Sequence, residues 1–134
     1  MFELLDAFKK KEFIRDLKLC KTLMEDKEYP WILLIPMRDN IMQINQLSEE
    51  DSVQLMKEIR IASKIMNELF DSERLNIAAI GNKTPQLHIH IISRKSSDSL
   101  WPKTVWGMQM KKLTDSEKID RADKIRESFS KIEL

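Results

Sequence analysis

The chain has 134 residues, of which 42% are apolar and 34% are charged, and 23 lysines and arginines are balanced by 22 aspartates and glutamates. This composition is typical of a globular protein with one domain over residues 1–134, and it excludes a disordered chain. A net charge of +1 provides no broad positive field. Nucleic acid is therefore not expected as a partner, whereas a small phosphorylated ligand needs only a few local groups.

The sequence gives no sign of export or of membrane insertion. The N-terminal residues carry acids and do not read as a signal peptide, and the longest apolar run, residues 31–35, is far too short to span a bilayer. The single cysteine, Cys20, has no partner in the chain for a disulfide. We therefore expect a cytoplasmic protein without a membrane contact, in which Cys20 is a core residue.

The first third of the chain predicts a helix followed by a hairpin. Residues 2–16 are expected to form a charged helix, although three consecutive lysines interrupt its apolar stripe. Residues 17–24 alternate partly and predict a strand, and residues 25–28 form a polar turn. Residues 31–35 are an apolar run typical of a buried central strand, which pairs with the strand before it.

The remainder predicts a long helix, a second hairpin and a final helix. Ser48 is a good N-cap, and apolar residues recur at helical spacing from there to Phe70. Residues 75–80 and 86–94 predict strands on either side of a turn, and residues 96–107 predict a loop. A capping-box pattern at Thr114 begins the final helix. Hairpins in this order predict an α+β fold with an antiparallel sheet.

Both histidines of the chain, His88 and His90, lie two residues apart on the last predicted strand. Successive side chains of a strand point to opposite faces, so Gln86, His88 and His90 are expected on one face. The apolar residues between and after them, Leu87, Ile89 and Ile91, then point to the other face and can enter the core. The result is a row of two titratable rings and one amide.

Three interpretations of this row remain open from the residues alone. The histidines could simply face solvent without a role. They could hold a metal ion with a third ligand, although no carboxylate has an obvious spacing for that purpose, so no metal is predicted. The third interpretation is nucleophilic catalysis on phosphorus, since a neutral imidazole is a competent nucleophile near neutral pH.

The segment Gln86-Leu87-His88-Ile89-His90-Ile91-Ile92 resembles the histidine-triad motif, His-φ-His-φ-His-φ-φ, in which φ is apolar. Other segments agree with the same family in the same order. Residues 29–38 (YPWILLIPMR) resemble its strand ending in Ile/Val-Pro-x-Arg/Lys, residues 76–82 resemble the strand and turn before the motif, and Trp101-Pro102 resembles a pair after it. The resemblance covers about residues 17–107.

The resemblance implies an antiparallel sheet of about five strands with a long central helix and a C-terminal helix, and a homodimer. It implies an enzyme without a cofactor that acts at the α-phosphate of a nucleotide conjugate, such as a dinucleoside polyphosphate or a nucleoside phosphoramidate. His88 would attack phosphorus and form a nucleotidyl-histidine intermediate, and His90 would contact the phosphate. Further nucleotide-binding residues would be Asn82 and Thr84 near the phosphate and Glu25 or Asp26 near the ribose. Independently of the resemblance, Trp101 and Trp106 could cover the base or a partner subunit, since aromatic rings suit stacking, or they could anchor their loop to the sheet.

The chain departs from the motif at its first position, where Gln86 stands in place of a histidine. Glutamine cannot titrate, but it keeps a hydrogen-bond donor, so Gln86 is expected in the catalytic site with its amide bound to the same phosphoryl oxygens. A second departure is Asp39, where some members carry a histidine and where a carboxylate would repel a phosphate. The alternative function is therefore a nucleotide-binding module with little or no turnover.

Overall fold

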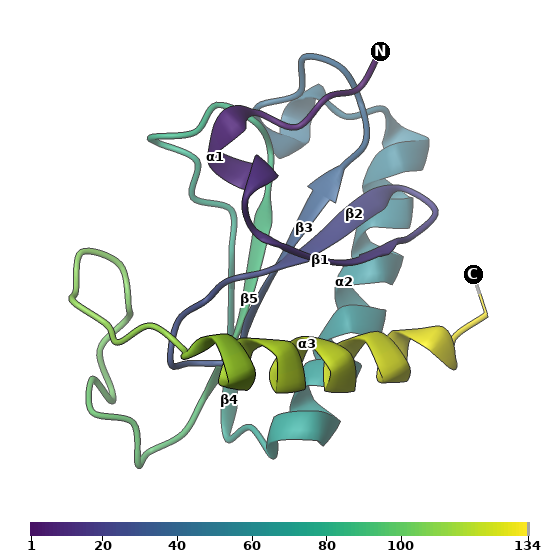
Figure 1. The fold of residues 1–134 in the computed structure, drawn as a ribbon. Helices are drawn as coiled ribbons and strands as arrows, with labels where there is room; N and C mark the ends of the chain where they lie inside the picture. Colours follow the sequence, from purple (N-terminus) through teal and green to yellow (C-terminus); the bar gives the residue numbers. More distant parts are fainter. Residues whose placement is uncertain (134) are drawn as a thin grey trace.

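The computed structural model describes residues 1–133, so Leu134, the last residue of the predicted domain, lies outside the described residues. Five antiparallel strands form one sheet in the order β1-β2-β3-β5-β4 (Figure 1). This confirms the predicted α+β class. The strands are β1 (Glu12–Asp16), β2 (Cys20–Met24), β3 (Trp31–Pro36), β4 (Arg74–Ala78) and β5 (Ile89–Arg94), and the helices are α1 (Asp6–Lys9), a 3-10 turn (Ile44–Gln46), α2 (Glu49–Phe70) and α3 (Asp115–Ser130).

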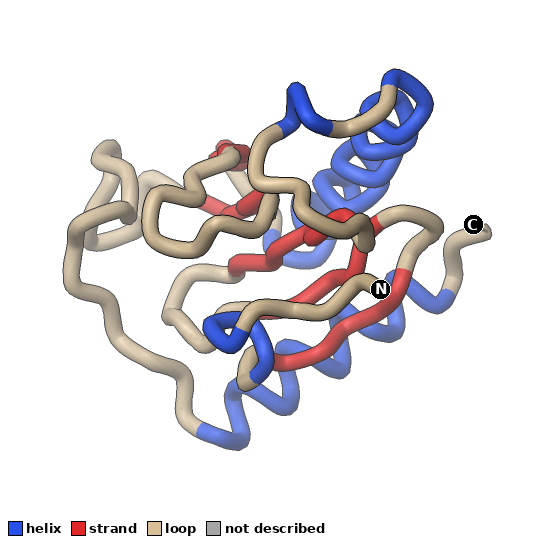
Figure 2. Tube along the Cα trace, turned by 90° about the horizontal axis from the view of Figure 1, so that it is seen from above, coloured by secondary structure: helices blue, strands red, loops and turns tan. Residues whose placement is uncertain are grey.

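The two faces of the sheet carry separate apolar clusters. The long helices α2 and α3 pack on one face, where Leu87, Ile89 and Ile91 join their core as predicted. The opposite face is covered by the N-terminal segment and the loop after β5, through residues such as Phe8 and Val105. Figure 2 shows the strands with the long helices on one side and most of the long loops on the other. The central strand β3 is consequently buried along its whole length.

The predicted helix over residues 2–16 is wrong. Only Asp6–Lys9 is helical, and Glu12–Asp16 forms the edge strand β1, which pairs with β2. The three lysines that interrupt the apolar stripe mark the point where the helix ends. Beyond them, Ile14 is buried whereas Phe13 is 47% exposed, as the alternation of an edge strand requires.

The long helix α2 begins as predicted. The Ser48 side chain accepts a hydrogen bond from the Asp51 backbone N–H at 3.1 Å, and the first turn carries three acids. One carboxylate of α2, that of Glu58, is only 1% exposed. It accepts hydrogen bonds of 2.8 Å from the backbone N–H groups of Leu19 and Cys20. The buried carboxylate therefore ties the start of β2 to α2.

Cys20 lies in the core at 0% exposure, as expected from the sequence. Burial, together with the neighbouring Glu58 carboxylate, raises the pKa of its thiol far above the usual range. A reactive thiolate is therefore not available at this position.

The final helix α3 has the predicted capping box. The Thr114 side chain accepts from the Glu117 backbone N–H, and the Glu117 side chain accepts from the Thr114 backbone N–H. Ala122, Ile125 and Phe129 are fully buried against the sheet, whereas Ile119 is 53% exposed. Within residues 1–133, no helix combines the length and apolar character needed to cross a membrane.

Candidate active site

The two histidines lie at the start of β5, on the face of the sheet opposite α2 and α3. His90 belongs to β5, and His88 precedes the strand by one residue. Their rings meet in an edge contact, with centroids 4.8 Å apart and an angle of 69° between the ring planes, and their exposed fractions are only 6% and 7%. The solvent-facing interpretation of the pair is therefore wrong, because burial on this scale removes both rings from bulk water.

The position of the proton on His88 follows from one backbone contact. The Nδ1 atom lies 2.7 Å from the Gln86 carbonyl oxygen, which can only accept a hydrogen bond. The neutral ring therefore carries its proton on Nδ1 and a free lone pair on Nε2. Phe8 packs on the same ring in an edge contact with centroids 4.9 Å apart. Nε2 is thus the ring nitrogen with a free lone pair, and the ring is held by Gln86 on one side and by Phe8 on another.

His90 is held in the opposite tautomer. The indole N–H of Trp31 donates to its Nδ1 at 3.0 Å, so the proton of the neutral ring is on Nε2, 3.3 Å from the Ile80 carbonyl oxygen. Burial, followed by the proximity of His88, lowers the pKa of His90 to about 4. His90 is therefore a neutral hydrogen-bond donor at pH 7 and carries no charge.

These contacts also bear on the metal interpretation. Both ring nitrogens of His90 already face protein groups, which leaves no lone pair directed at an ion. Among residues 1–133, no three or more histidine, cysteine, aspartate or glutamate side chains gather in an arrangement that could hold a metal.

Both histidines line a cavity of about 770 Å³. This volume suits a small organic ligand. Its wall carries more cationic than anionic side chains, although the whole chain is nearly neutral. The cations are Lys10, Lys11, Lys27, Lys83, Lys112 and Lys118, and the acids are Glu12, Glu25 and Asp26. One cation is already paired, since Lys11 Nζ lies 2.6 Å from a Glu25 carboxylate oxygen. The excess of lysines favours an anionic ligand.

The cavity brings together most of the residues that the sequence singled out. His88, His90, Asn82 and Thr84 line it from the start of β5 and the turn before it. Glu25 and Asp26 line it from the segment between β2 and β3. Gly81, in the same turn, allows a close approach of the backbone, since a Cβ atom there would lie only 3.1 Å from the Thr84 carbonyl oxygen.

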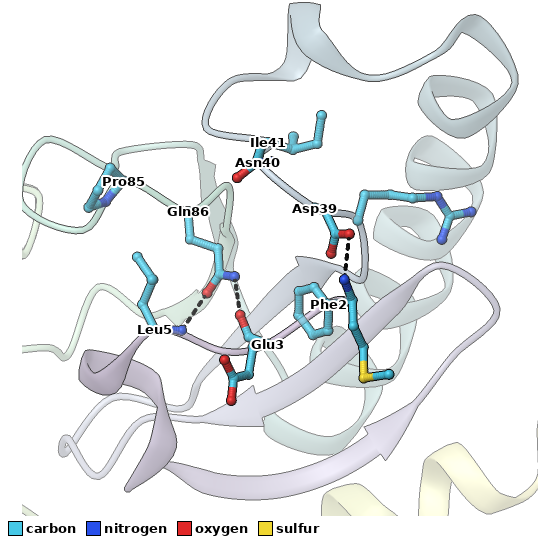
Figure 3. A pocket seen from close by; sticks show the side chains of 10 residues that line it. Phe2, Glu3, Leu5, Asp39, Asn40, Ile41, Pro85 and Gln86 are labelled. Carbon is cyan, nitrogen blue, oxygen red and sulfur yellow. Dashed lines mark hydrogen bonds and ion pairs between the residues drawn. The ribbon is translucent and has the colours of Figure 1, made fainter.

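Two of the predicted site residues lie elsewhere. Within the described residues, Trp101 does not line this cavity, and its ring faces the buried Arg94 guanidinium at 5.9 Å. The Gln86 side chain lies on a separate cavity of about 390 Å³, together with Asp39 (Figure 3). The predicted row of three on one strand face is therefore incomplete, because the regular strand begins only at Ile89.

Of the two loop tryptophans, Trp106 rather than Trp101 lies beside the histidines, with its ring centroid 5.5 Å from that of His90. Two further aromatic contacts of the site were not predicted from the sequence: Trp31 contacts His90, and Phe8 contacts His88. The apolar run around Trp31 indicated a buried strand but gave no sign of its indole N–H partner. The contact of Phe8 was not predicted because Phe8 was expected within a long helix over residues 2–16.

The comparisons with known proteins agree with this architecture. The family model described as HIT domain matches residues 8–97. A histidine triad protein from Bradyrhizobium japonicum is 38% identical, with a TM-score of 0.90, and the match covers 95% of this chain and 97% of that one. A histidine triad protein from Marinobacter aquaeolei is 31% identical, with a TM-score of 0.92 and 99% of both chains covered.

A more distant structure, a hypothetical histidine triad nucleotide-binding protein from Sulfolobus tokodaii, shares the fold at 19% identity, with a TM-score of 0.69 over 90% of this chain and 85% of that one. The curated proteins gave no match. The family model covers well over half of the chain, and the two nearer structures align along almost its whole length. The chain therefore belongs to the HIT domain family.

Proposed function

We propose that this chain binds a nucleotide conjugate in the cavity over His88 and His90, and that it hydrolyses or transfers the nucleoside monophosphate group through a covalent adduct on His88. The family supports this class, because HIT domain proteins are generally nucleotide-binding hydrolases or transferases. The observation that carries the proposal is the 2.7 Å contact between His88 Nδ1 and the Gln86 carbonyl, which leaves the lone pair on Nε2.

The proposed reaction has two displacements at the same phosphorus. Nε2 of His88 attacks the α-phosphorus, the bond from phosphorus to the leaving group breaks, and the leaving group departs with the bonding electrons and takes up a proton. A water molecule then attacks the phosphorus of the adduct and loses a proton to solvent, the P–N bond breaks with its electrons returning to Nε2, and the nucleoside monophosphate is released. In a transfer reaction, an acceptor hydroxyl or amine takes the place of water.

His90 is proposed to bind the phosphoryl group as a neutral donor. Its Nε2–H contacts the Ile80 carbonyl over 3.3 Å, a long hydrogen bond that a phosphoryl oxygen can replace. Because the pKa of His90 is lowered to about 4, an imidazolium at this position is not available to protonate the leaving group near pH 7. Solvent or the substrate itself supplies that proton.

The other groups of the wall fit the parts of a nucleotide. Asn82 and Thr84, beside His88, are proposed to bind phosphate, and Lys83 adds positive charge in the same turn. Glu25 and Asp26 are proposed to accept hydrogen bonds from the ribose hydroxyls. Trp106, which lines the cavity next to His90, offers an apolar ring for the base in place of Trp101.

The second candidate is a nucleotide-binding module with little turnover. It is favoured by Gln86, which stands at the first position of the triad and lies outside the cavity of the histidines. The homodimer and the cytoplasmic location implied by the sequence stay predictions under both candidates.

A turnover assay separates the two candidates. The purified protein is incubated with adenosine phosphoramidate or a diadenosine polyphosphate, and release of AMP is followed by chromatography, while the affinity for AMP is measured by calorimetry. The enzyme requires multiple turnovers that are lost in His88→Ala, with the folded state retained. AMP binding without release of product from either substrate would favour the binding module instead.

A further inference from the structure

The Gln86 side chain ties the N-terminal segment, residues 2–8, to the chain just before β5. Its Nε2–H group donates to the Glu3 carbonyl oxygen at 2.9 Å, and its Oε1 accepts from the Leu5 backbone N–H at 3.0 Å (Figure 3). Both ends of the amide therefore bind the backbone of one segment that is more than 80 positions away in sequence. The amide binds the C=O of one residue and the N–H of the residue two positions further on, so it spans Leu4.

The same segment carries an aromatic ring to His88. The Leu5 carbonyl accepts from the Phe8 backbone N–H at 2.9 Å, so the residue that Gln86 holds begins the turn that places Phe8. Phe8 is only 3% exposed and packs edge-on against the His88 ring, with centroids 4.9 Å apart. A continuous set of contacts thus runs from the Gln86 amide through Leu5 to Phe8 and then to His88.

His88 is consequently restrained twice by the same residue. The Gln86 carbonyl holds the ring directly through Nδ1, and the Gln86 side chain holds it indirectly through the segment that carries Phe8. We infer that Gln86 is a positioning residue, whose amide clamps residues 2–8 so that Phe8 keeps Nε2 of His88 directed into the nucleotide cavity. This inference rests on the proposed function and adds a role for the first position of the motif.

A direct contact between the Gln86 amide and the substrate phosphate is the competing explanation. The side chain lines a separate cavity, and it does not line the cavity of the histidines within the described residues. The position of the Gln86 side chain therefore supports an indirect role, in which it acts on His88 through the packing of Phe8.

The test compares Gln86→Met, Phe8→Leu and the double variant with the unmodified protein. The matched control is Gln109→Met, because Gln109 is exposed and lies outside the histidine cavity. The rate of the first turnover with adenosine phosphoramidate is measured by rapid quench, and AMP affinity by calorimetry. We expect Gln86→Met to lower the rate on the order of ten-fold, since small misplacements of a reacting group are costly, with AMP affinity within about two-fold. Gln109→Met should match the unmodified protein.

The double variant distinguishes transmission through Phe8 from direct contact. If Gln86 acts through the segment, the double variant should be about as slow as the slower single variant, because residues that act as a unit are not additive. Rate losses that multiply, together with a parallel loss of AMP affinity, would overturn the inference. Should Gln86→Met fail to fold, Gln86→Glu is used, which keeps the acceptor for Leu5 but loses the donor to Glu3; a smaller loss of rate in the same direction is expected.

Two readouts that need no turnover keep this inference separate from the proposed function. Amide hydrogen exchange at Leu5 should be at least about ten-fold faster in Gln86→Met, because that amide loses its partner. The ring ¹⁵N resonances of His88 should show mobility or a mixture of tautomers. An unmodified protein that turns over no substrate would refute the proposed function alone, whereas unchanged exchange and unchanged ring resonances in Gln86→Met would refute the clamp alone.

Discussion

The Trp31 indole N–H donates a 3.0 Å hydrogen bond to Nδ1 of His90, and the two rings lie 5.6 Å apart. Trp31 pairs with Ile92 across β3 and β5, so it is the diagonal neighbour of His90 on the same face of the sheet. The indole donates only, which requires an unprotonated Nδ1 on His90. One buried tryptophan thus sets the tautomer of the ring that is proposed to bind phosphate.

Replacing Trp31 by phenylalanine removes this donor and keeps most of the apolar volume. We expect His90 to exchange between its two neutral tautomers, because Nδ1 no longer has an obligatory partner. AMP affinity should fall about three- to ten-fold, in line with the loss of one oriented hydrogen bond. Ring ¹⁵N spectra report the tautomer, and calorimetry reports the affinity. A single unchanged tautomer in Trp31→Phe would show that the indole does not control this ring.

The low pKa of His90 makes a prediction about stability and pH. An unfolded histidine titrates near pH 6.5, whereas His90 in the folded protein binds its proton only near pH 4. Between these values the unfolded state binds more protons, so the contribution of His90 is complete above about pH 6.5 and is lost as the pH falls toward 4. The free energy of unfolding should therefore fall more steeply over this window in the unmodified protein than in His90→Asn. If the free energy of unfolding has the same pH dependence in both proteins, the lowered pKa of His90 is contradicted.

The lysines of the cavity should attract the phosphate in a salt-dependent manner. Lys83 lines the cavity in the turn beside Asn82, whereas Lys103 is exposed outside it. Lys83→Gln should weaken AMP binding about two- to five-fold at low ionic strength, with a smaller effect at high salt, as expected for an exposed charge. Lys103→Gln is the control and should change little. Equal effects of both substitutions would indicate attraction by overall charge rather than by the cavity.

The contacts of Glu58 lead to a prediction about the stability of the fold. Its buried carboxylate accepts from the backbone N–H groups of Leu19 and Cys20, and Glu58→Ala would leave both without a partner. We expect the free energy of unfolding to fall by about 3 kcal/mol, since unsatisfied buried groups are costly. Glu68→Ala, on an exposed position of α2, should cost far less. Urea denaturation of both variants measures the difference, and a similar small loss in each would refute this role of Glu58.

Local patterns predicted the elements that carry the histidines. The alternation around Ile89 and Ile91 fixed which residues enter the core, and Ser48 and Thr114 correctly marked the starts of the long helices. The N-terminal segment could not be predicted in this way, because its conformation depends on the distant Gln86 amide. The sequence also could not predict that Trp106 rather than Trp101 lies beside the histidines. Both residues belong to an aperiodic loop, and the path of that loop is set by tertiary contacts.

The central claim is that Nε2 of His88 attacks the α-phosphorus of a nucleotide conjugate. The most direct measurement is a single-turnover reaction with adenosine phosphoramidate, quenched in alkali to preserve a phosphorus–nitrogen bond, followed by intact-mass and peptide analysis. The proposed mechanism predicts a nucleotidyl adduct on the peptide that contains His88, and no adduct in His88→Ala. Turnover that persists in a folded His88→Ala protein would contradict it.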